Sequence, residues 1–371
     1  MKLADLLSQR TVVGELWRAE NGKVRCIACH HRCLIEEGST GICKVRYVRE
    51  GKLWVPFGYV IGGVACDPVE KKPFYHLYPG SNAVTFGMLG CNFHCEFCQN
   101  WVTSQALREN ISTTRIIEIT PEEIATLAKR YKAKLVVSSY NEPVITAEWA
   151  KAVFEKAVRL GLKCAFVSNG YATRDTLTYL QPFMVGYKVD LKTFREENYR
   201  RCGGKLANVL DTIKTAYELG YWVEIVTLVV PKFNDDELQL REIAKFIASL
   251  SKDIPWHVTA FHPDYKYTDV GPTPLKTLLR AAEIGREEGL NYVYAGNLPG
   301  RVGEWENTKC PKCGELLVER VGFSVLRYNI TFEGKCPKCG YTVPGLWYTQ
   351  EDFAAGYSPE TNAYRDPTSL I

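Results

Sequence analysis

The sequence has no uninterrupted apolar stretch long enough to span a bilayer, and its amino terminus has no apolar core followed by a small-residue cleavage site. It also lacks a basic run with interleaved aromatic residues, and its net charge is only +4. The absence of a long apolar stretch excludes a helix that crosses a membrane. The absence of a basic, aromatic-rich run argues against a nucleic-acid partner. We therefore expect a cytoplasmic protein that acts on neither a membrane nor a nucleic acid.

Cysteine, in contrast, is abundant, with 14 in 371 residues. A disulfide scaffold is typical of short secreted chains and does not fit a chain of this length without a secretion signal. Eleven of the cysteines fall into three tight clusters, a pattern typical of metal sites. The others are Cys66, Cys164 and Cys202, of which Cys164 lies in an apolar run and is expected to be a small buried hydrophobe.

The central cluster, CNFHCEFC, places Cys91, Cys95 and Cys98 in a CxxxCxxC array. A cubane iron–sulfur cluster normally has one thiolate on each of four irons, so three cysteines leave one iron open to an exchangeable ligand. The alternative is a structural zinc ion bound by these thiolates and His94. Structural zinc usually takes its ligands as two separated pairs, so the array favours an iron–sulfur cluster with an open iron.

This spacing, followed by Gln99 and Asn100, resembles the radical S-adenosylmethionine (radical SAM) enzymes, and more narrowly their branch with the glycyl-radical-enzyme activases. The resemblance implies a [4Fe–4S] cluster whose open iron binds the amino and carboxylate groups of S-adenosylmethionine. It also implies an external low-potential electron donor, since the reduced cluster breaks a sulfur–carbon bond to give a 5′-deoxyadenosyl radical.

The middle of the chain alternates short apolar runs with longer amphipathic ones. The apolar runs lie at 83–89, 135–139, 164–168, 184–191, 222–230, 256–261 and 292–295. Helical patterns lie at 121–131, 146–160, 206–219, 236–250 and 274–288, the first with Thr120 as its cap. This repetition predicts a parallel sheet, either doubly wound or an incomplete barrel. The resemblance favours the barrel, so the predicted fold class is α/β, a partial (β/α)6-type TIM barrel.

At this length we expect more than one module. The predicted division is a cysteine-rich segment at 1–75, the partial barrel at 76–300, and a ribbon-like metal-binding module at 301–371.

Polar residues follow the apolar runs, where parallel strands collect chemistry at their carboxyl ends. The residues that the resemblance assigns to cofactor binding are Phe97, Asn141, Glu142, Ser168, Asn169, Asp190, Lys192 and His262. Glu142 would accept the methionyl ammonium, although Tyr140 and Asn141 replace two glycines that are usual in the family. Ser168 and Asn169 would hydrogen-bond to the ribose hydroxyls.

The remaining candidates have other parts of the ligand as their expected partners. Lys192 would face the methionyl carboxylate, with Asp190 orienting neighbouring groups. Phe97 would pack against the adenine or cover the cluster. His257 lies on an apolar strand and is expected to be a core residue, whereas His262 at the strand end is the better candidate for contact with S-adenosylmethionine or substrate.

Two matching CPKCG units supply Cys310, Cys313, Cys336 and Cys339. Two such turns together complete a tetrahedral four-sulfur site, with zinc as the first choice and a single rubredoxin-type iron as the alternative. The metal would hold together a segment too small to build its own core.

The amino-terminal cluster, CIACHHRC with one further cysteine, is less specific. Its members are Cys26, Cys29, Cys33 and Cys43. They could bind zinc or an auxiliary iron–sulfur cluster, with His30 and His31 as spare ligands.

The order of these motifs, from the amino-terminal cysteines through CDPVEKKP, YNEP, SNGY, DLK, FHPDY and AGNLPG to the CPKCG pair, resembles the AmmeMemoRadiSam-system radical SAM enzymes. The predicted activity is reductive cleavage of S-adenosylmethionine and hydrogen abstraction from an unknown substrate, either a protein glycine or a small molecule. The alternative of another class is a non-catalytic iron–sulfur or zinc protein for electron transfer or partner binding.

Overall fold

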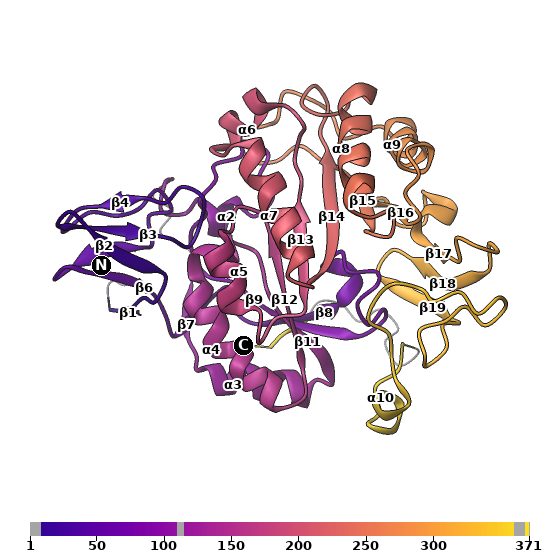
Figure 1. The fold of residues 1–371 in the computed structure, drawn as a ribbon, viewed down its shortest axis with the longest axis horizontal. Coiled ribbons are helices and arrows are strands. Elements are labelled where there is room, and N and C mark those ends of the chain that lie inside the picture. Colours follow the sequence, from indigo (N-terminus) through magenta and orange to yellow (C-terminus); the bar gives the residue numbers. More distant parts are fainter. Residues whose placement is uncertain (1–8, 110–114, 360–367, 371) are drawn as a thin grey trace.

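A computed structural model describes residues 9–109, 115–359 and 368–370. Figure 1 shows a strand-rich amino-terminal segment at one end of the molecule, a large sheet with helices in the middle, and a small carboxy-terminal module at the other end. Among the described residues, no helix is both long and apolar enough to cross a membrane.

The central sheet has nine strands in the order β16-β15-β14-β13-β12-β11-β9-β8-β20. They are β8 (Ala65–Pro68), β9 (Asn82–Phe86), β11 (Ala133–Ser138), β12 (Lys163–Ser168), β13 (Gly186–Asp190), β14 (Trp222–Val229), β15 (Trp256–Ala260), β16 (Val293–Gly296) and β20 (Thr368–Ser369). The strands from β9 to β16 are parallel, whereas β8 and β20 extend the sheet as antiparallel strands. The α/β prediction with a parallel sheet is confirmed.

Helices connect the parallel strands. They are α2 (Trp101–Ser104), α3 (Pro121–Arg130), α4 (Ala147–Arg159), α5 (Arg174–Leu180), α6 (Glu196–Cys202), α7 (Leu206–Glu218), α8 (Glu237–Leu250) and α9 (Leu275–Glu287). The predicted start of α3 is confirmed, since Thr120 and Glu123 form a reciprocal capping box ahead of Pro121. The short helices α5 and α6 were not predicted.

The two faces of the sheet have different covers, which excludes the doubly wound alternative for the described part of the chain. On one face, side chains such as Val136 and Phe166 pack in the same core as residues of α3, α4, α7, α8 and α9. On the other face, Leu135 and Val137 pack against Phe74 from the connection between β8 and β9. A sheet with helices on one face and open edges has the architecture of an incomplete barrel.

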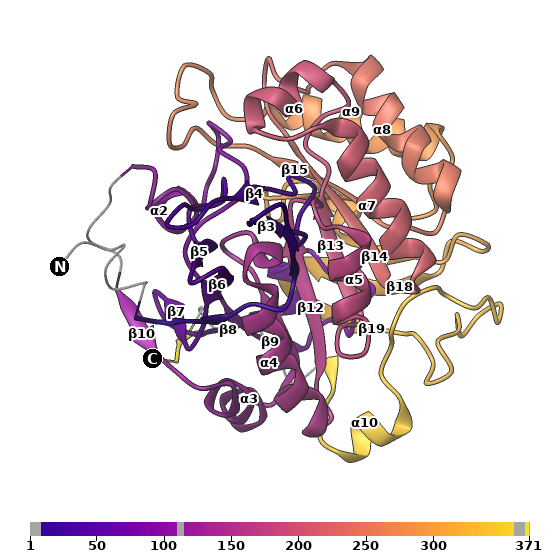
Figure 2. The ribbon, with the colours of Figure 1, turned by 60° about the vertical axis from the view of Figure 1, so that its left-hand side comes forward.

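The amino-terminal segment forms two small three-stranded sheets and a strand pair. Its strands are β1 (Thr11–Val13), β2 (Trp17–Glu20), β3 (Lys23–Cys26), β4 (Leu34–Ile35), β5 (Tyr47–Arg49), β6 (Lys52–Pro56) and β7 (Tyr59–Ile61), the last paired with β10 (Ile116–Glu118). Figure 2 brings this segment forward, with α4 and α5 beside it. A buried ion pair between Arg46 and Glu148 of α4 fixes it to the barrel.

The carboxy-terminal module closes the side of the sheet opposite the helices. It contains the three-stranded sheet of β17 (Thr308–Lys309), β18 (Leu316–Val321) and β19 (Ser324–Tyr328), and the short helix α10 (Gln350–Ala354). The guanidinium of Arg320 is fully buried, 3.4 Å from Glu70 Oε1, and donates to the Tyr75 carbonyl at 2.8 Å. Arg320 therefore joins the carboxy-terminal module to the connection between β8 and β9, which covers the face of the sheet opposite the helices.

Replacing Arg320 by alanine should destabilise the protein strongly, because it leaves the carboxylate of Glu70 buried without its cation. Breaking a buried ion pair in this way costs about 3–5 kcal/mol. The midpoint of denaturant-induced unfolding should therefore fall clearly for Arg320→Ala and stay within error for the control Arg327→Ala, an exposed arginine on the neighbouring strand β19. Equal midpoints for the two variants would contradict the proposed role of Arg320.

Candidate functional site

The three central cysteines lie on the loop that follows β9, at the carboxyl end of the parallel sheet. Cys95 is buried, and Cys91 and Cys98 are half-buried. The Phe93 amide donates to Cys91 Sγ at 3.3 Å, and the Ser104 hydroxyl lies 3.2 Å from Cys98 Sγ. Donors directed at sulfur stabilise thiolates as metal ligands, so the chemistry of this loop fits an iron–sulfur cluster.

A fourth cysteine, Cys202 at the end of α6, was not predicted to belong to this region. Its buried thiol contacts the Cys95 thiol, and this contact lowers the pKa of Cys95. The backbone brings the two together, because the His94 amide donates to the Cys202 carbonyl at 2.9 Å. No sequence motif signalled this contact, since 107 positions separate the two cysteines.

Glu142 is buried directly after β11 and faces the end of β12. Its carboxylate accepts from Ser168 Oγ at 2.7 Å, from the Asn169 amide at 2.8 Å and from the Val144 amide at 3.1 Å. Burial nevertheless raises the pKa of Glu142 to about 7. A positively charged or N–H-donating partner would stabilise the ionised form of this carboxyl group, as the predicted methionyl amino group would do.

Asn169 connects this carboxylate to the cysteine loop. Its Nδ2 donates to Asn92 Oδ1 at 2.8 Å and lies 3.8 Å from Cys91 Sγ. Its Oδ1 is buried without a hydrogen-bond partner among the described residues. Buried polar atoms are normally satisfied, so this acceptor beside Cys91 fits a ligand with hydroxyl or amino donors. Asn141 has a positioning contact instead, since its Oδ1 accepts from the Met88 amide at 3.0 Å.

Asp190 and Lys192 lie at the end of β13, close enough to Cys95 for their charges to shift its pKa. Asp190 forms ion pairs with Lys188 and, at 3.8 Å, with Lys192. Burial alone would lower the pKa of Lys192, but Asp190 and the nearby Cys95 thiol raise it overall. The lysine therefore stays cationic beside the cysteine loop, as binding of a carboxylate would require.

The last two predicted residues, Phe97 and His262, differ in their surroundings. Phe97 is buried in edge contact with Phe233, their centroids 4.9 Å apart, and its predicted role against the adenine or over the cluster stays a prediction. His262 is exposed, with a ring nitrogen 3.5 Å from the Pro263 carbonyl, and no described contact joins it to the cysteine loop. His257 is a buried core residue as predicted, 2.6 Å from Glu224.

A second polar cluster, which was not predicted, lies beside the turn that carries Glu142. Lys72 Nζ donates to Asp67 Oδ2 at 2.6 Å and to the Tyr140 hydroxyl at 2.8 Å. Burial lowers the pKa of Lys72 to about 8. Tyr140 has a left-handed backbone with φ of 69°, an uncommon conformation for a bulky residue. Two sequence features pointed to this region, Tyr140 where the family has glycine and the motif CDPVEKKP that contains Asp67 and Lys72.

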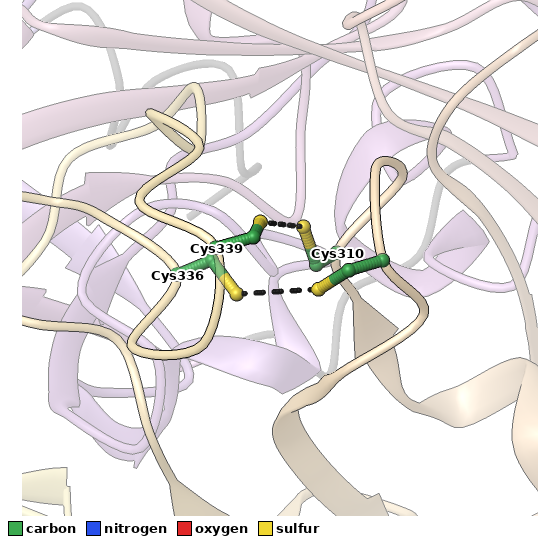
Figure 3. Close-up of side chains that lie close together, drawn as sticks. Cys310, Cys336 and Cys339 are labelled. Atoms are coloured by element: carbon green, nitrogen blue, oxygen red, sulfur yellow. Dashed lines mark hydrogen bonds between the residues drawn. The ribbon is translucent and has the colours of Figure 1, made fainter.

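The carboxy-terminal cysteines converge on a single point (Figure 3). The sulfurs of Cys310 and Cys339 lie 3.6 Å apart, and those of Cys313 and Cys336 lie 3.7 Å apart. Sulfurs at about 2.3 Å from a tetrahedral zinc lie about 3.8 Å from one another. The set is therefore compatible with one metal ion.

Changing Cys336 and Cys339 together to serine should remove one metal ion per chain, with zinc as our first expectation. The measurement is metal content per chain after removal of loosely bound ions, with Cys66→Ser as the control outside the three clusters. Retention of the same metal content by the double variant would show that this set binds no ion.

Comparison with known proteins identifies the family. The family model described as "Radical SAM superfamily" matches residues 86–247. An uncharacterized protein of Methanocaldococcus jannaschii is 40% identical over 326 residues, which is 87% of this chain and 96% of that protein. From the same organism, a putative glycyl-radical enzyme activating enzyme is 27% identical, covering 49% of this chain and 68% of its own.

Solved structures were compared as well. A domain of a pyruvate-formate lyase-activating enzyme from Bacteroides vulgatus is 18% identical to this chain, with a TM-score of 0.39, over 44% of this chain and 98% of that domain. The match to the family model agrees with the predicted family. The chain therefore belongs to the radical SAM superfamily.

Proposed function

We propose that this protein cleaves S-adenosylmethionine reductively and abstracts a hydrogen atom from a substrate. The observation that carries the proposal is the position of three thiols beside a buried carboxylate and an unpaired amide oxygen at the carboxyl end of the sheet. When bound, a [4Fe–4S] cluster and S-adenosylmethionine supply the electron and the 5′-deoxyadenosyl radical for such chemistry.

The residues of the chain would orient the cofactor and exclude water. The Glu142 carboxylate would accept N–H hydrogen bonds from the methionyl amino group, and the Ser168 hydroxyl holds this carboxylate in place. Lys192 pairs with the methionyl carboxylate, and Asn169 Oδ1 accepts from a ribose hydroxyl. An external low-potential protein supplies one electron for each cleavage.

The test of this proposal is an anaerobic assay. Protein reconstituted with iron and sulfide, then given dithionite and S-adenosylmethionine, should release 5′-deoxyadenosine. Failure to release it from protein that contains a full cluster would contradict the proposal.

Two substrate classes have separate support. Similarity to the putative glycyl-radical enzyme activating enzyme supports a glycine of a partner protein. The buried cluster of Asp67, Lys72 and Tyr140, next to the Glu142 turn, supports a polar small molecule, because buried charges of this kind can pair with a charged ligand.

A fractionated cell extract distinguishes the two classes. The extract is separated by ultrafiltration, and each fraction is tested for stimulation of 5′-deoxyadenosine release. Stimulation by the macromolecular fraction, lost after protease treatment, indicates a protein substrate. Stimulation by the filtrate indicates a small molecule, and the variant Lys72→Met should then lose it.

A further inference from the structure

We propose that Cys26, Cys29, Cys33 and Cys43 bind a second [4Fe–4S] cluster, which carries single electrons to the central cysteine site. This inference assigns a metal site in addition to the proposed function. It depends on the geometry of the amino-terminal segment and not on the identity of the substrate.

All four cysteines line one closed pocket. Cys26 ends β3, Cys29 and Cys33 lie on the turn between β3 and β4, and Cys43 lies on the turn before β5. The other lining residues are Ala28, Ile35, Gly41, Ile42, Arg46 and Ile145. Three of the cysteines are buried and Cys33 is half-buried. Four thiols around an enclosed, largely apolar space are the donor set of a cubane cluster with no open iron.

The spacing of the thiols differs from that of a single-ion site. Among the described residues, the group whose ligand atoms all lie within 4.8 Å of one another is the carboxy-terminal set. The amino-terminal thiols do not meet this limit, and neither do Cys91, Cys95 and Cys98. A cluster is larger than an ion, so its thiolates must be further apart. In this respect the amino-terminal set matches Cys91, Cys95 and Cys98, the predicted ligands of an iron–sulfur cluster, and differs from the carboxy-terminal set.

The histidines do not turn toward this pocket. The ring of His31 is 3.0 Å from the Asn92 carbonyl, and the ring of His30 is 3.7 Å from Asp211. Neither of them lines the pocket. The donor set is thus four thiols, and the sequence-based suggestion of histidine ligands is not supported.

Hydrogen-bond donors surround the sulfurs. Arg46 Nη1 lies 3.4 Å from Cys26 Sγ, and its guanidinium is held by an ion pair with Glu148. Backbone amides also face the thiols, that of His31 toward Cys29 and that of Val45 toward Cys43. Such donors, together with a buried cation, stabilise the negative charge of a thiolate-bound cluster and set its reduction potential.

The pocket is adjacent to the central site through one residue. Asn92, which follows Cys91, has a side chain that faces the Cys29 thiol. Its Oδ1 accepts from Asn169 Nδ2 at 2.8 Å, so the same side chain contacts both the amino-terminal cysteines and the residue beside Cys91. The backbone of Cys29 also pairs with that of Ala172 in an isolated antiparallel β-bridge, just after the Ser168–Gly170 turn.

This adjacency gives the second cluster its function. A low-potential one-electron donor protein reduces the amino-terminal cluster by one electron. That electron would then pass to a cluster held by Cys91, Cys95 and Cys98, and the first cluster would return to its oxidised state. No bond is made and no proton moves in this transfer.

The test is iron, acid-labile sulfide and zinc per chain, with electron paramagnetic resonance of dithionite-reduced protein. The full chain should contain about eight irons and eight sulfides in two cubanes. The variant with Cys91, Cys95 and Cys98 changed to alanine should keep about four of each and a one-electron reduced cluster signal. Changing Cys29 and Cys33 to serine in that variant should remove the remaining iron and sulfide together with the reduced cluster signal. Retention of the carboxy-terminal metal is the control for folding.

Two outcomes would overturn this assignment. One is zinc without iron in the triple-alanine variant, and the other is a full chain with about four irons whose signal disappears entirely in that variant. Neither outcome depends on cleavage of S-adenosylmethionine, so failure of the proposed function and failure of this inference give different results.

Discussion

Replacing Cys98 by alanine should abolish release of 5′-deoxyadenosine, whereas replacing Cys202 by alanine should preserve it. Loss of any one of three thiolates leaves a second iron without a protein ligand, and a cluster held by two thiolates is expected to be lost. The Cys202 thiol contacts the Cys95 thiol, but our account does not count Cys202 among the ligands of the cluster.

The measurement is 5′-deoxyadenosine per chain in a single anaerobic turnover, with iron content determined on the same samples. We expect the 5′-deoxyadenosine released by Cys98→Ala to fall below detection, and that released by Cys202→Ala to be about the parent amount. Loss of iron from Cys202→Ala would show that this cysteine occupies the fourth corner of the cluster. That result would remove the open iron on which the proposed function depends.

The second large effect concerns the pH dependence of S-adenosylmethionine binding. Burial raises the pKa of Glu142 to about 7, so in the ligand-free protein its carboxyl is protonated below pH 7. An amino group bound to iron is neutral and donates its N–H groups to the carboxylate, so binding below pH 7 must release one proton from Glu142 and one from the amino group of the free ligand. The dissociation constant should therefore rise about a hundredfold for each pH unit below 7, and about tenfold for each unit between pH 7 and the pKa of the free amino group near 8.

The control for this effect is Glu142→Gln, which cannot titrate. A hydrogen bond between charged groups contributes about 1.5–3 kcal/mol, so this variant should bind S-adenosylmethionine about 10- to 100-fold more weakly at pH 8. Its dissociation constant should keep only the tenfold-per-unit dependence that comes from the amino group of the ligand and should lack the further dependence that Glu142 adds below pH 7. Equal dissociation constants at pH 6 and pH 8 in the parent protein would contradict the proposed role of Glu142.

The sequence predicted best those features that depend on local spacing. The CPKCG pair and the strand–helix alternation are each visible within a few tens of residues, and the structure contains both. Glu142, Ser168 and Asn169 were predictable as neighbours, because the carboxyl ends of β11 and β12 meet at one edge of the sheet.

Contacts between distant segments could not be predicted. The cluster of Asp67, Lys72 and Tyr140 depends on the pairing of β8 with β9, and 68 positions separate Lys72 from Tyr140. The contact between Cys95 and Cys202 depends on α6, a helix of seven residues that is too short for a clear periodic pattern. Side-chain packing across these distances decides the shape of the site, and no local sequence pattern indicates it.

The central claim is an iron with an exchangeable position at Cys91, Cys95 and Cys98. Its most direct test is electron–nuclear double resonance of the reduced protein with S-adenosylmethionine labelled at the amino nitrogen and the carboxylate oxygen. Our account predicts hyperfine coupling to both labels in the parent protein and in Cys202→Ala. A reduced cluster of normal iron content that shows coupling to neither label would contradict the claim.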